Sequence, residues 1–219
     1  MTFSFQYVLQ ILPLLLLGAE VTFEATLGGM AFALVGGLIL AVARMSPSRP
    51  LSRAAVAYIE FVRSTPLLIQ LFFLFYVLPA FGITMSSLLT GILGLGLHYS
   101  TYTAEVYRSG IEGVPRGQWE AAVALNLPPF QTWTRVILPQ AIPPIIPVLG
   151  NYLIGMFKDT PLLATITVRE LLGAALNAAG ESFRYLEPIS LVGAIFFVLS
   201  YPSALLIRRL EVGLAIRRR

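Results

Sequence analysis

The sequence predicts an all-α protein that crosses a membrane several times. Hydrophobic residues occupy 57% of the 219 positions, charged residues only 12%, and the mean hydropathy is +0.79. A soluble domain carries a charged fraction of about 25%. Apolar runs of about 18 residues or more, enough to cross a bilayer as a helix, recur along the chain. The sequence has no cysteine, which excludes disulfides and thiolate metal sites.

The apolar runs define five predicted spans, at residues 17–43, 54–78, 88–107, 144–163 and 188–207. The preceding apolar stretch, residues 3–16, is interrupted by Pro13. We interpret residues 1–16 as a separate segment with a short helix at the outer interface. The alternative is that this stretch simply begins the first span. A cleaved signal peptide is not expected, because no basic residue precedes Arg44.

The basic residues predict the orientation in the membrane. Most of the 15 would lie on one side of a five-span protein: Arg44, Arg49 and Arg53 after the first span, Arg108, Arg116 and Arg135 after the third, and Arg208, Arg209, Arg217, Arg218 and Arg219 after the fifth. The positive-inside rule then places the N-terminus outside and the C-terminus in the cytoplasm. Because these residues flank spans and form no continuous patch, a nucleic-acid partner is not expected.

The polar connection at residues 109–143 is therefore predicted to be cytoplasmic and to form two helices joined by a turn. Residues 118–125 are strong helix formers, and the adjacent Ala121 and Ala122 are expected to present a smooth surface that another backbone can approach closely. Asn126 tolerates the left-handed conformation that ends a helix, and the prolines that follow suit the start of another. Phe130, Trp133 and Ile137 are expected to share one face. Two interpretations stay open: the connection docks a partner, or it packs on its own membrane domain.

Several catalytic functions are excluded by residue counts. The single lysine, Lys158, follows Phe157, so no phosphate-binding Gly-Lys loop exists. One histidine cannot form a His-x-x-x-His zinc site, and one aspartate cannot form a two-aspartate protease. Ser182 lies in no convincing nucleophile motif. His98 is interpreted as a hydrogen-bonded packing residue.

Charged residues inside the predicted spans are candidates for a role in transport, since burying one costs on the order of 3 kcal/mol near the bilayer centre. Arg63 follows Glu60 by three residues, and Arg108 follows Glu105 by three, so each pair can neutralise itself on its helix. Lys158 and Asp159 lie deeper, just before a proline. One could face a translocation path while the other binds a neighbouring span.

The cytoplasmic connection also resembles a known motif. Glu120, Ala121 and Ala122, the turn residue Asn126, and the run Val136, Ile137, Leu138 and Pro139 resemble the EAA loop of permease subunits of bacterial ATP-binding-cassette (ABC) importers. Asn126 stands where that family usually has Gly, and Val136 where it usually has Ile. Residues 63–67 (RSTPL), 104–108 (AEVYR), 115–118 (PRGQ) and 157–162 (FKDTPL) are similar to the polar-amino-acid branch. Residues 125–127, 140–144 and 183–188 resemble ectoine and hydroxyectoine uptake permeases.

The resemblance implies the type I ABC importer permease fold, with a transmembrane domain at residues 17–210 and a basic cytoplasmic tail at 211–219. It implies a translocation path for a small zwitterion, most specifically ectoine or hydroxyectoine, with a polar amino acid as the alternative. Implied partners are ABC ATPase subunits, which hold the ATP and Mg²⁺, a second permease subunit, identical or homologous, and a solute-binding protein, in a bacterial inner membrane. The implied ATPase-coupling residues are Glu120, Ala121, Ala122, Leu125, Asn126, Leu138 and Pro139.

The candidate residues for the translocation path are Arg63, Thr65, Gln70, Lys158, Asp159 and Thr160. No residue of this chain is expected to hold a cofactor or a metal ion, or to perform catalysis. Two functions from other classes stay open, a homo-oligomeric channel and a membrane-anchored sensor. A channel leaves the EAA loop unexplained, and a sensor has little use for five spans with buried charges. Copurification with an ATPase would separate both from an importer subunit.

Overall fold

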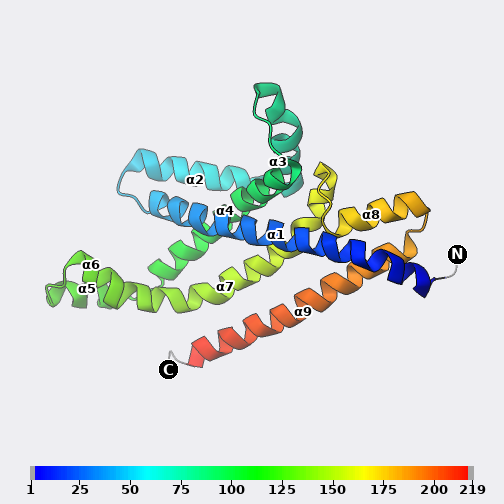
Figure 1. Ribbon diagram of the computed structural model, residues 1–219. Helices are drawn as coiled ribbons and strands as arrows, with labels where there is room; N and C mark the ends of the chain where they lie inside the picture. The colour runs from blue at the N-terminus through cyan, green and yellow to red at the C-terminus, as the bar shows by residue number, and fades with distance from the viewer. Residues whose placement is uncertain (1–2, 217–219) are drawn as a thin grey trace.

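The computed structural model describes residues 3–216, and all regular secondary structure in those residues is helical (Figure 1). The all-α prediction is confirmed. The predicted basic tail at residues 211–219 lies partly outside the described residues. Four long helices run along the molecule: α1 (Phe5–Arg44), α4 (Ser87–Glu112), α7 (Leu138–Asp159) and α9 (Leu186–Ile216).

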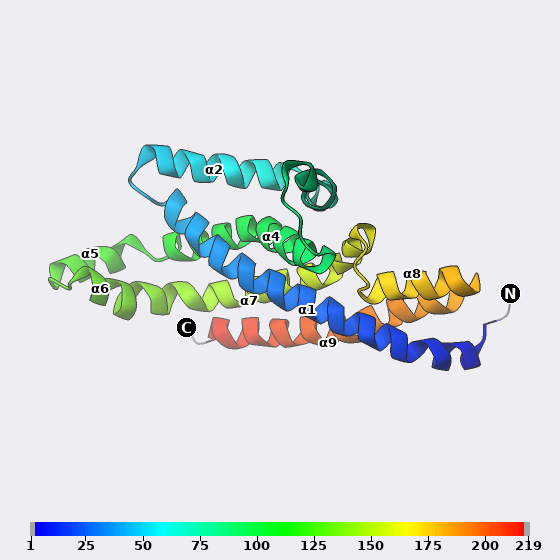
Figure 2. The same cartoon turned by 45° about the horizontal axis from the view of Figure 1, so that its top comes forward.

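Short helices occupy the two ends of this bundle. α5 (Arg116–Ala124) and α6 (Pro129–Gln131) lie at one end, to which the C-terminal part of α9 also points (Figures 1 and 2). α8 (Leu171–Ser182) lies at the opposite end with the first turns of α1. The N-terminal region and the connection before α9 are thus together, away from the α5–α6 connection.

The N-terminal stretch does not form a separate helix, so that prediction is wrong. α1 begins after Ser4, whose Oγ accepts a hydrogen bond from the backbone N–H of Tyr7 at 3.3 Å, and continues through Pro13 to Arg44. Proline removes one backbone hydrogen bond, but membrane proteins tolerate it where neighbouring helices support the helix. Here Ile11 and Leu15 are buried against α8 and α9.

The second predicted span is bent. Its first half is α2 (Arg49–Ser64), and its second half, Leu67–Phe81, begins with α3 (Leu67–Phe72). The direction of the chain bends by 103° between the two halves. Pro66 causes the break, because it has no N–H to donate and disfavours helical backbone at the residue before it. Thr65 accordingly has extended angles, φ −106° and ψ 136°. Two short irregular turns, Phe73–Val77 and Leu78–Phe81, follow α3.

The helices differ in how clearly they qualify as membrane spans. By length and apolar composition, Phe5–Arg44, Pro129–Ile166 and Leu186–Gly213 qualify among the described residues, and the bent α2–α3 pair is a fourth if it counts as one span. α4 contains the third predicted span but does not qualify. Its hydropathy is reduced by buried hydroxyl residues such as Thr101 and Thr103, which bond to backbone carbonyls inside the bundle. The fourth predicted span lies within Pro129–Ile166, and the fifth lies within Leu186–Gly213.

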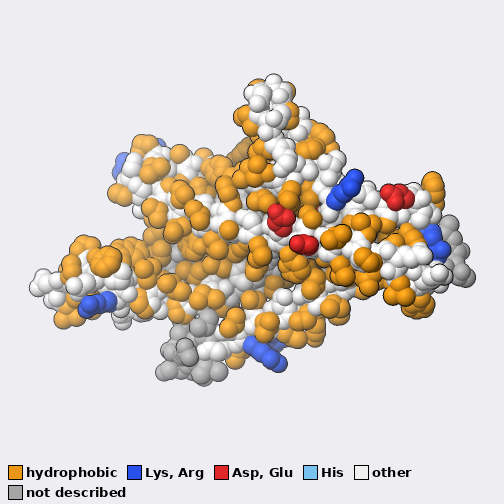
Figure 3. All heavy atoms as spheres, in the orientation of Figure 1, with side chains coloured by type: hydrophobic (Ala, Val, Ile, Leu, Met, Phe, Trp, Pro, Cys, Tyr) orange, Lys and Arg blue, Asp and Glu red, His pale blue; other side chains and the backbone are white. Residues whose placement is uncertain are grey.

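Close packing of α1 on α4 organises the bundle. A Cβ at Gly37 would lie 2.9 Å from the carbonyl oxygen of Ser100, so only glycine permits this approach. The Thr103 hydroxyl donates to the Ala33 carbonyl at 2.7 Å across the same interface. Small residues and interhelical hydroxyl bonds are the usual means of helix association in membranes. Hydrophobic side chains cover most of the face in Figure 3, with Lys and Arg mainly towards its edges.

Candidate functional site: the α5–α6 elbow and a tyrosine cluster

The turn that ends α5 has the geometry predicted from Asn126. Asn126 is left-handed, with φ 54°. The N–H of Leu127 donates to the Ala122 carbonyl at 3.0 Å, and the N–H of Asn126 donates to Val123 at 2.9 Å. These two bonds form a Schellman motif, which satisfies the last carbonyls of the helix. We call the segment from Arg116 to Ile137 the elbow.

The two alanines of the elbow do not share a surface, contrary to the sequence prediction. Ala122 is only 2% exposed and faces its own chain, whereas Ala121 is exposed together with Glu120. Val123 and Leu125 are 74% and 73% exposed. Successive helical residues point about 100° apart, which lets Ala122 face the bundle while Ala121 lies on the exposed part of the helix. The elbow therefore presents Ala121, Val123 and Leu125 outward.

The second half of the elbow divides its apolar side chains between two directions. Phe130 is 78% exposed, whereas Ile137 is fully buried beside Val114 and Ala141. The prediction that Phe130, Trp133 and Ile137 share one face is wrong, because the wide turn Thr132–Ile137 changes the helical phase. The packing interpretation is confirmed for Ile137, which lies against the membrane bundle, whereas docking of a partner on the exposed Phe130 stays a prediction.

Contacts across the elbow hold its two helices together. The rings of Trp119 and Trp133 meet edge to face, with centroids 5.3 Å apart. The Gln140 side chain donates to the Gln118 side-chain oxygen at 3.1 Å. Leu138 is half-buried and Pro139 exposed at the start of α7. The elbow is thus a braced unit continuous with α7, and a displacement of its exposed surface would be passed to that helix.

A cluster of three tyrosines lies between α4 and α7, near the bend of α2–α3. The rings of Tyr99, Tyr102 and Tyr152 have centroid separations of 5.7–6.1 Å. The guanidinium of Arg63 lies over the Tyr102 ring, 5.0 Å from its centroid. On the other side of the cluster, the Tyr99 hydroxyl donates to Asp159 Oδ2 at 2.7 Å. A cation and a carboxylate thus flank a set of aromatic rings.

Two predicted path residues instead build the bend between α2 and α3. The Gln70 amide nitrogen donates to the carbonyls of Val62 and Thr65, at 2.8 and 3.0 Å, and to the Thr65 hydroxyl at 3.0 Å. Its oxygen lies 3.2 Å from Nδ1 of His98. The expected hydrogen-bonded role of His98 is confirmed. Gln70 and Thr65 therefore satisfy the carbonyls that the proline break leaves open.

The remaining predicted residues are placed in three different surroundings. Lys158 is exposed beside a hollow of about 500 Å³ next to α9, on a different side from Asp159. Thr160 is fully buried, and its hydroxyl donates to the Phe157 carbonyl at 2.8 Å. Of the six residues predicted for a path, the structure brings Arg63 and Asp159 to the tyrosine cluster.

Of the two ion pairs predicted within helices, the structure contains the one between Glu105 and Arg108. Arg108 contacts Glu105 as expected, with Nη2 to Oε2 at 3.0 Å, and both join a larger network with Arg44 and Glu112. The expected pair of Arg63 with Glu60 is not among the ion pairs of the described residues, since Arg63 lies over an aromatic ring instead. The tyrosine cluster was not predicted from the sequence. The spacing of Tyr99 and Tyr102, three apart on the same helix, was the available signal.

Comparisons with known proteins agree with this geometry. Residues 33–215 match the model of the family described as "binding-protein-dependent transport system inner membrane component". The chain is 47% identical over 211 residues to the probable amino-acid ABC transporter permease protein y4tG of Sinorhizobium fredii, covering 96% of this chain and 91% of that one. It is 36% identical over 204 residues to the L-cystine transport system permease protein TcyB of Bacillus subtilis, covering 91% and 87%.

A solved structure has the same fold over nearly the whole chain. The crystal structure of an amino acid ABC transporter with histidines superposes with a TM-score of 0.91 at 33% identity, covering 97% of this chain and 100% of that one. The predicted permease fold is confirmed by this match.

Proposed function

We propose that this chain, which belongs to the family of binding-protein-dependent transport system inner membrane components, forms half of the path by which an ABC importer carries a polar amino acid. Its similar proteins are permease subunits of amino-acid ABC transporters, so the chain is the membrane component and not the ATPase. None of the relatives described above is named for ectoine, and the amino-acid alternative is the one their names support.

The observation that carries this proposal is the braced elbow with its exposed apolar side chains. Ala121, Val123, Leu125 and Phe130 face outward, although Trp119 and Ile137 next to them are packed inward. Exposed apolar groups on a rigid segment are typical of a docking surface. The proposed occupant is a groove of a partner ATPase, which would bind ATP and Mg²⁺. The motion of that subunit would reach the bundle through α7.

The proposed contact with the solute is the tyrosine cluster. A zwitterionic amino acid has a carboxylate, which a guanidinium binds well, and an ammonium, which a carboxylate or an aromatic face binds. Arg63 and Asp159 provide these opposite charges, the first over the Tyr102 ring and the second bonded to the Tyr99 hydroxyl. Because one chain leaves this cluster partly open, we propose that a second permease subunit, identical or homologous, completes the path.

Reconstitution of the importer tests the function. The chain, its ATPase and its solute-binding protein are placed in liposomes of bacterial lipid, and ATP-dependent uptake is measured for labelled amino acids and for ectoine. Uptake of at least one polar amino acid, with ectoine failing to compete, is the expected result. Uptake of ectoine alone would contradict the amino-acid assignment, and absence of any copurifying ATPase would contradict the importer.

Variants of the cluster test the path. Asp159→Asn should assemble normally with the ATPase but lose most uptake, because it removes the acceptor charge from the Tyr99 hydroxyl bond. Lys158→Gln is the matched comparison at the next position, on the side facing α9. Wild-type uptake by Asp159→Asn would contradict the proposed contact, and reduced assembly would assign Asp159 to packing.

The proposed orientation has the N-terminus outside the bacterial inner membrane and the C-terminus in the cytoplasm. Topology reporters after residue 219 and within residues 128–131 should report the cytoplasm, and one near Gly180 should report the outside. A reversal of any of the three would contradict this orientation.

A further inference from the structure

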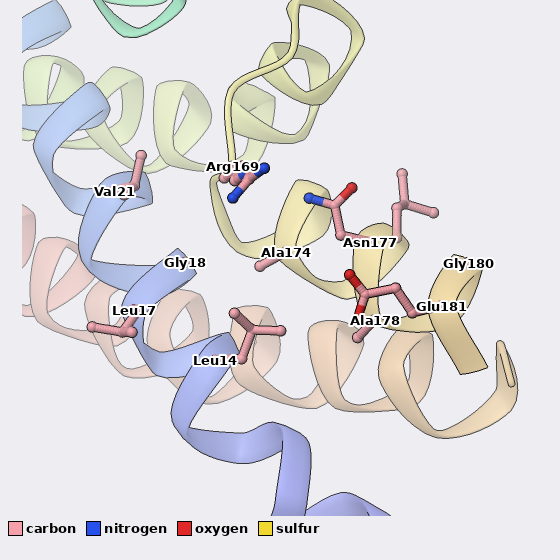
Figure 4. Close-up of a pocket in the computed structure, with 11 residues that line it drawn as sticks. Leu14, Leu17, Gly18, Val21, Arg169, Ala174, Asn177, Ala178, Gly180 and Glu181 are labelled. Atoms are coloured by element: carbon pink, nitrogen blue, oxygen red, sulfur yellow. The ribbon is translucent and has the colours of Figure 1, made fainter. Parts of the chain in front are cut away.

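A hollow of about 680 Å³ opens between α1 and α8, at the end of the molecule that holds the N-terminal region (Figure 4). Its α1 wall is apolar and consists of Leu14, Leu17 and Val21. The opposite side carries three polar residues, namely Arg169 just before α8, and Asn177 and Glu181 one turn apart on it. In Figure 4 the Asn177 and Glu181 side chains extend from α8 over the hollow, and Arg169 lies at its other corner.

The walls of this hollow are held firmly in place. A Cβ at Gly18 would lie 2.9 Å from the Ala174 Cβ and 3.0 Å from the Glu170 carbonyl oxygen, so α1 and α8 touch closely at one point. The hollow opens alongside that contact. The buried Glu170 carboxylate caps α8 by accepting from the N–H groups of Gly173 and Leu172, at 2.7 and 3.0 Å. The Tyr7 hydroxyl donates to the Ala178 carbonyl at 3.1 Å, near the other end of α8.

The charged residues that line the hollow form no ion pair with the described residues. Among the described residues, the ion pairs of arginine involve Arg44, Arg108 and Arg184, and neither Arg169 nor Glu181 takes part in one. At about 1.5 Å per residue, Glu181 lies on the order of 16 Å along α8 from the cap at Glu170. The ion pairs of the described residues do not include one between Arg169 and Glu181, although both line the hollow. A cation and an anion thus lie towards the two ends of the α8 side, opposite the apolar wall of α1.

We propose that this hollow is an outer binding site for a free zwitterionic amino acid, with Arg169 binding its carboxylate and Glu181 its ammonium. Asn177 can donate to the same carboxylate, and Leu14 and Leu17 would contact the side chain. The site would hold the solute before it enters the path at the tyrosine cluster. This inference rests on the proposed function, since it takes an amino acid as the solute and this end of the molecule as the outer one.

The arrangement favours a zwitterion over a simple ion. A lone anion would meet Glu181, and a lone cation would meet Arg169, so either would be repelled at one corner. A molecule with both charges satisfies both corners, and the bidentate geometry of guanidinium suits a carboxylate. The apolar wall excludes water from one side, which strengthens both contacts.

Equilibrium binding to the permease–ATPase complex in lipid nanodiscs, without any solute-binding protein, tests the proposal. The probes are labelled L-glutamine, L-arginine and L-cystine. Competitors are the α-amide of the bound amino acid, which lacks the carboxylate, and its N-acetyl derivative, which lacks the ammonium. We expect each competitor to bind about ten-fold more weakly than the amino acid, as for loss of one charged hydrogen bond.

The variants Arg169→Gln and Glu181→Gln should each weaken binding and change a different preference. Arg169→Gln should remove the discrimination against the α-amide, and Glu181→Gln the discrimination against the N-acetyl form. Glu20→Gln, an exposed acid on α1 outside the hollow, is the matched control and should bind as the wild type does.

Three results would overturn the inference. The first is that the wild type binds none of the probes, and the second is that both hollow variants bind as the wild type does. The third is that the two hollow variants bind free amino acid as the wild type does but need a higher concentration of solute-binding protein for uptake. That result would make the hollow a docking surface for the solute-binding protein. If the wild-type importer takes up no amino acid at all, the proposed function itself fails.

Discussion

α5 and α8 are both short helices between long ones, at opposite ends of the molecule, but different contacts hold them. α5 ends in a Schellman motif made by its own next residues, and its brace joins Trp119 to Trp133 fourteen positions later. α8 has a local cap in Glu170 but is fastened to α1 by residues far away in sequence. Thr22 on α1 accepts from the N–H of Leu171 at 3.1 Å, and Tyr7 bonds to the Ala178 carbonyl.

This difference decides what each end can do. The local contacts of α5 leave its outer side chains exposed, so a partner protein could bind the elbow without breaking contacts within the bundle. The distant contacts of α8 fasten it to α1, so the two helices move together and the hollow between them keeps its shape. One end is thus suited to receive motion, and the other to keep a fixed binding geometry.

The largest expected effect comes from changing the exposed face of α5. Ala121→Arg should leave folding intact, since Ala121 is exposed, but should overpack a docked partner at a cost of about 1–3 kcal/mol. Solute-stimulated ATP hydrolysis in the reconstituted importer should therefore fall by about ten-fold or more. Ala54→Arg, the same substitution at an exposed alanine of α2 outside the elbow, is the control. Normal stimulation in Ala121→Arg would contradict docking through this face.

Removing the cap of α8 should destabilise the other end. Glu170→Ala leaves two backbone N–H groups buried without an acceptor, which costs about 2 kcal/mol. Thermal unfolding in detergent should show a lowered Tm. Glu20→Ala, an exposed acid on α1, should leave Tm unchanged. An equal Tm for the two variants would mean that α8 is not held by its cap.

The turn at the end of α5 provides a smaller test. Asn126→Val should cost roughly 1–2 kcal/mol, because a side chain with a branched Cβ resists the left-handed conformation. Asn126→Gly should be tolerated, since glycine adopts a positive φ without strain. Limited proteolysis at the elbow and Tm measure both. An equal Tm and an equal rate of proteolysis for the two variants would show that the left-handed turn at residue 126 does not contribute to stability.

The smallest expected effect depends on pH at the α8 end. The ionised Glu187 carboxylate binds the Arg184 guanidinium and accepts a hydrogen bond from the backbone N–H of Ser4 at 3.0 Å. Protonation of this carboxylate weakens both contacts, so their contribution to stability is present near neutral pH and is lost as pH falls. Tm should therefore fall slightly from pH 6 towards pH 3, and Glu187→Gln should reduce that part of the fall. An identical pH profile for the variant would contradict the link.

Prediction from sequence succeeded where the cause is local and failed where it is distant. The turn at Asn126 follows from the residue itself, and the Glu105–Arg108 pair from a spacing of three on one helix. The prediction that Phe130 and Ile137 share one face was wrong, because a wide turn changes the helical phase between them. The prediction of a separate N-terminal helix was wrong, because packing against α8 and α9 outweighs the helix break that Pro13 alone would favour.

The sequence by itself determined the membrane class, the helical composition and the elbow, since hydropathy, helix length and turn chemistry act within a few residues. Only the tertiary structure decided that Arg63 lies over Tyr102, that Gln70 closes the bend of α2–α3, and that Arg169 and Glu181 line one hollow. These contacts join residues on different helices. Their geometry depends on how the helices cross, which close approaches such as that at Gly37 determine and which no local pattern in the chain records.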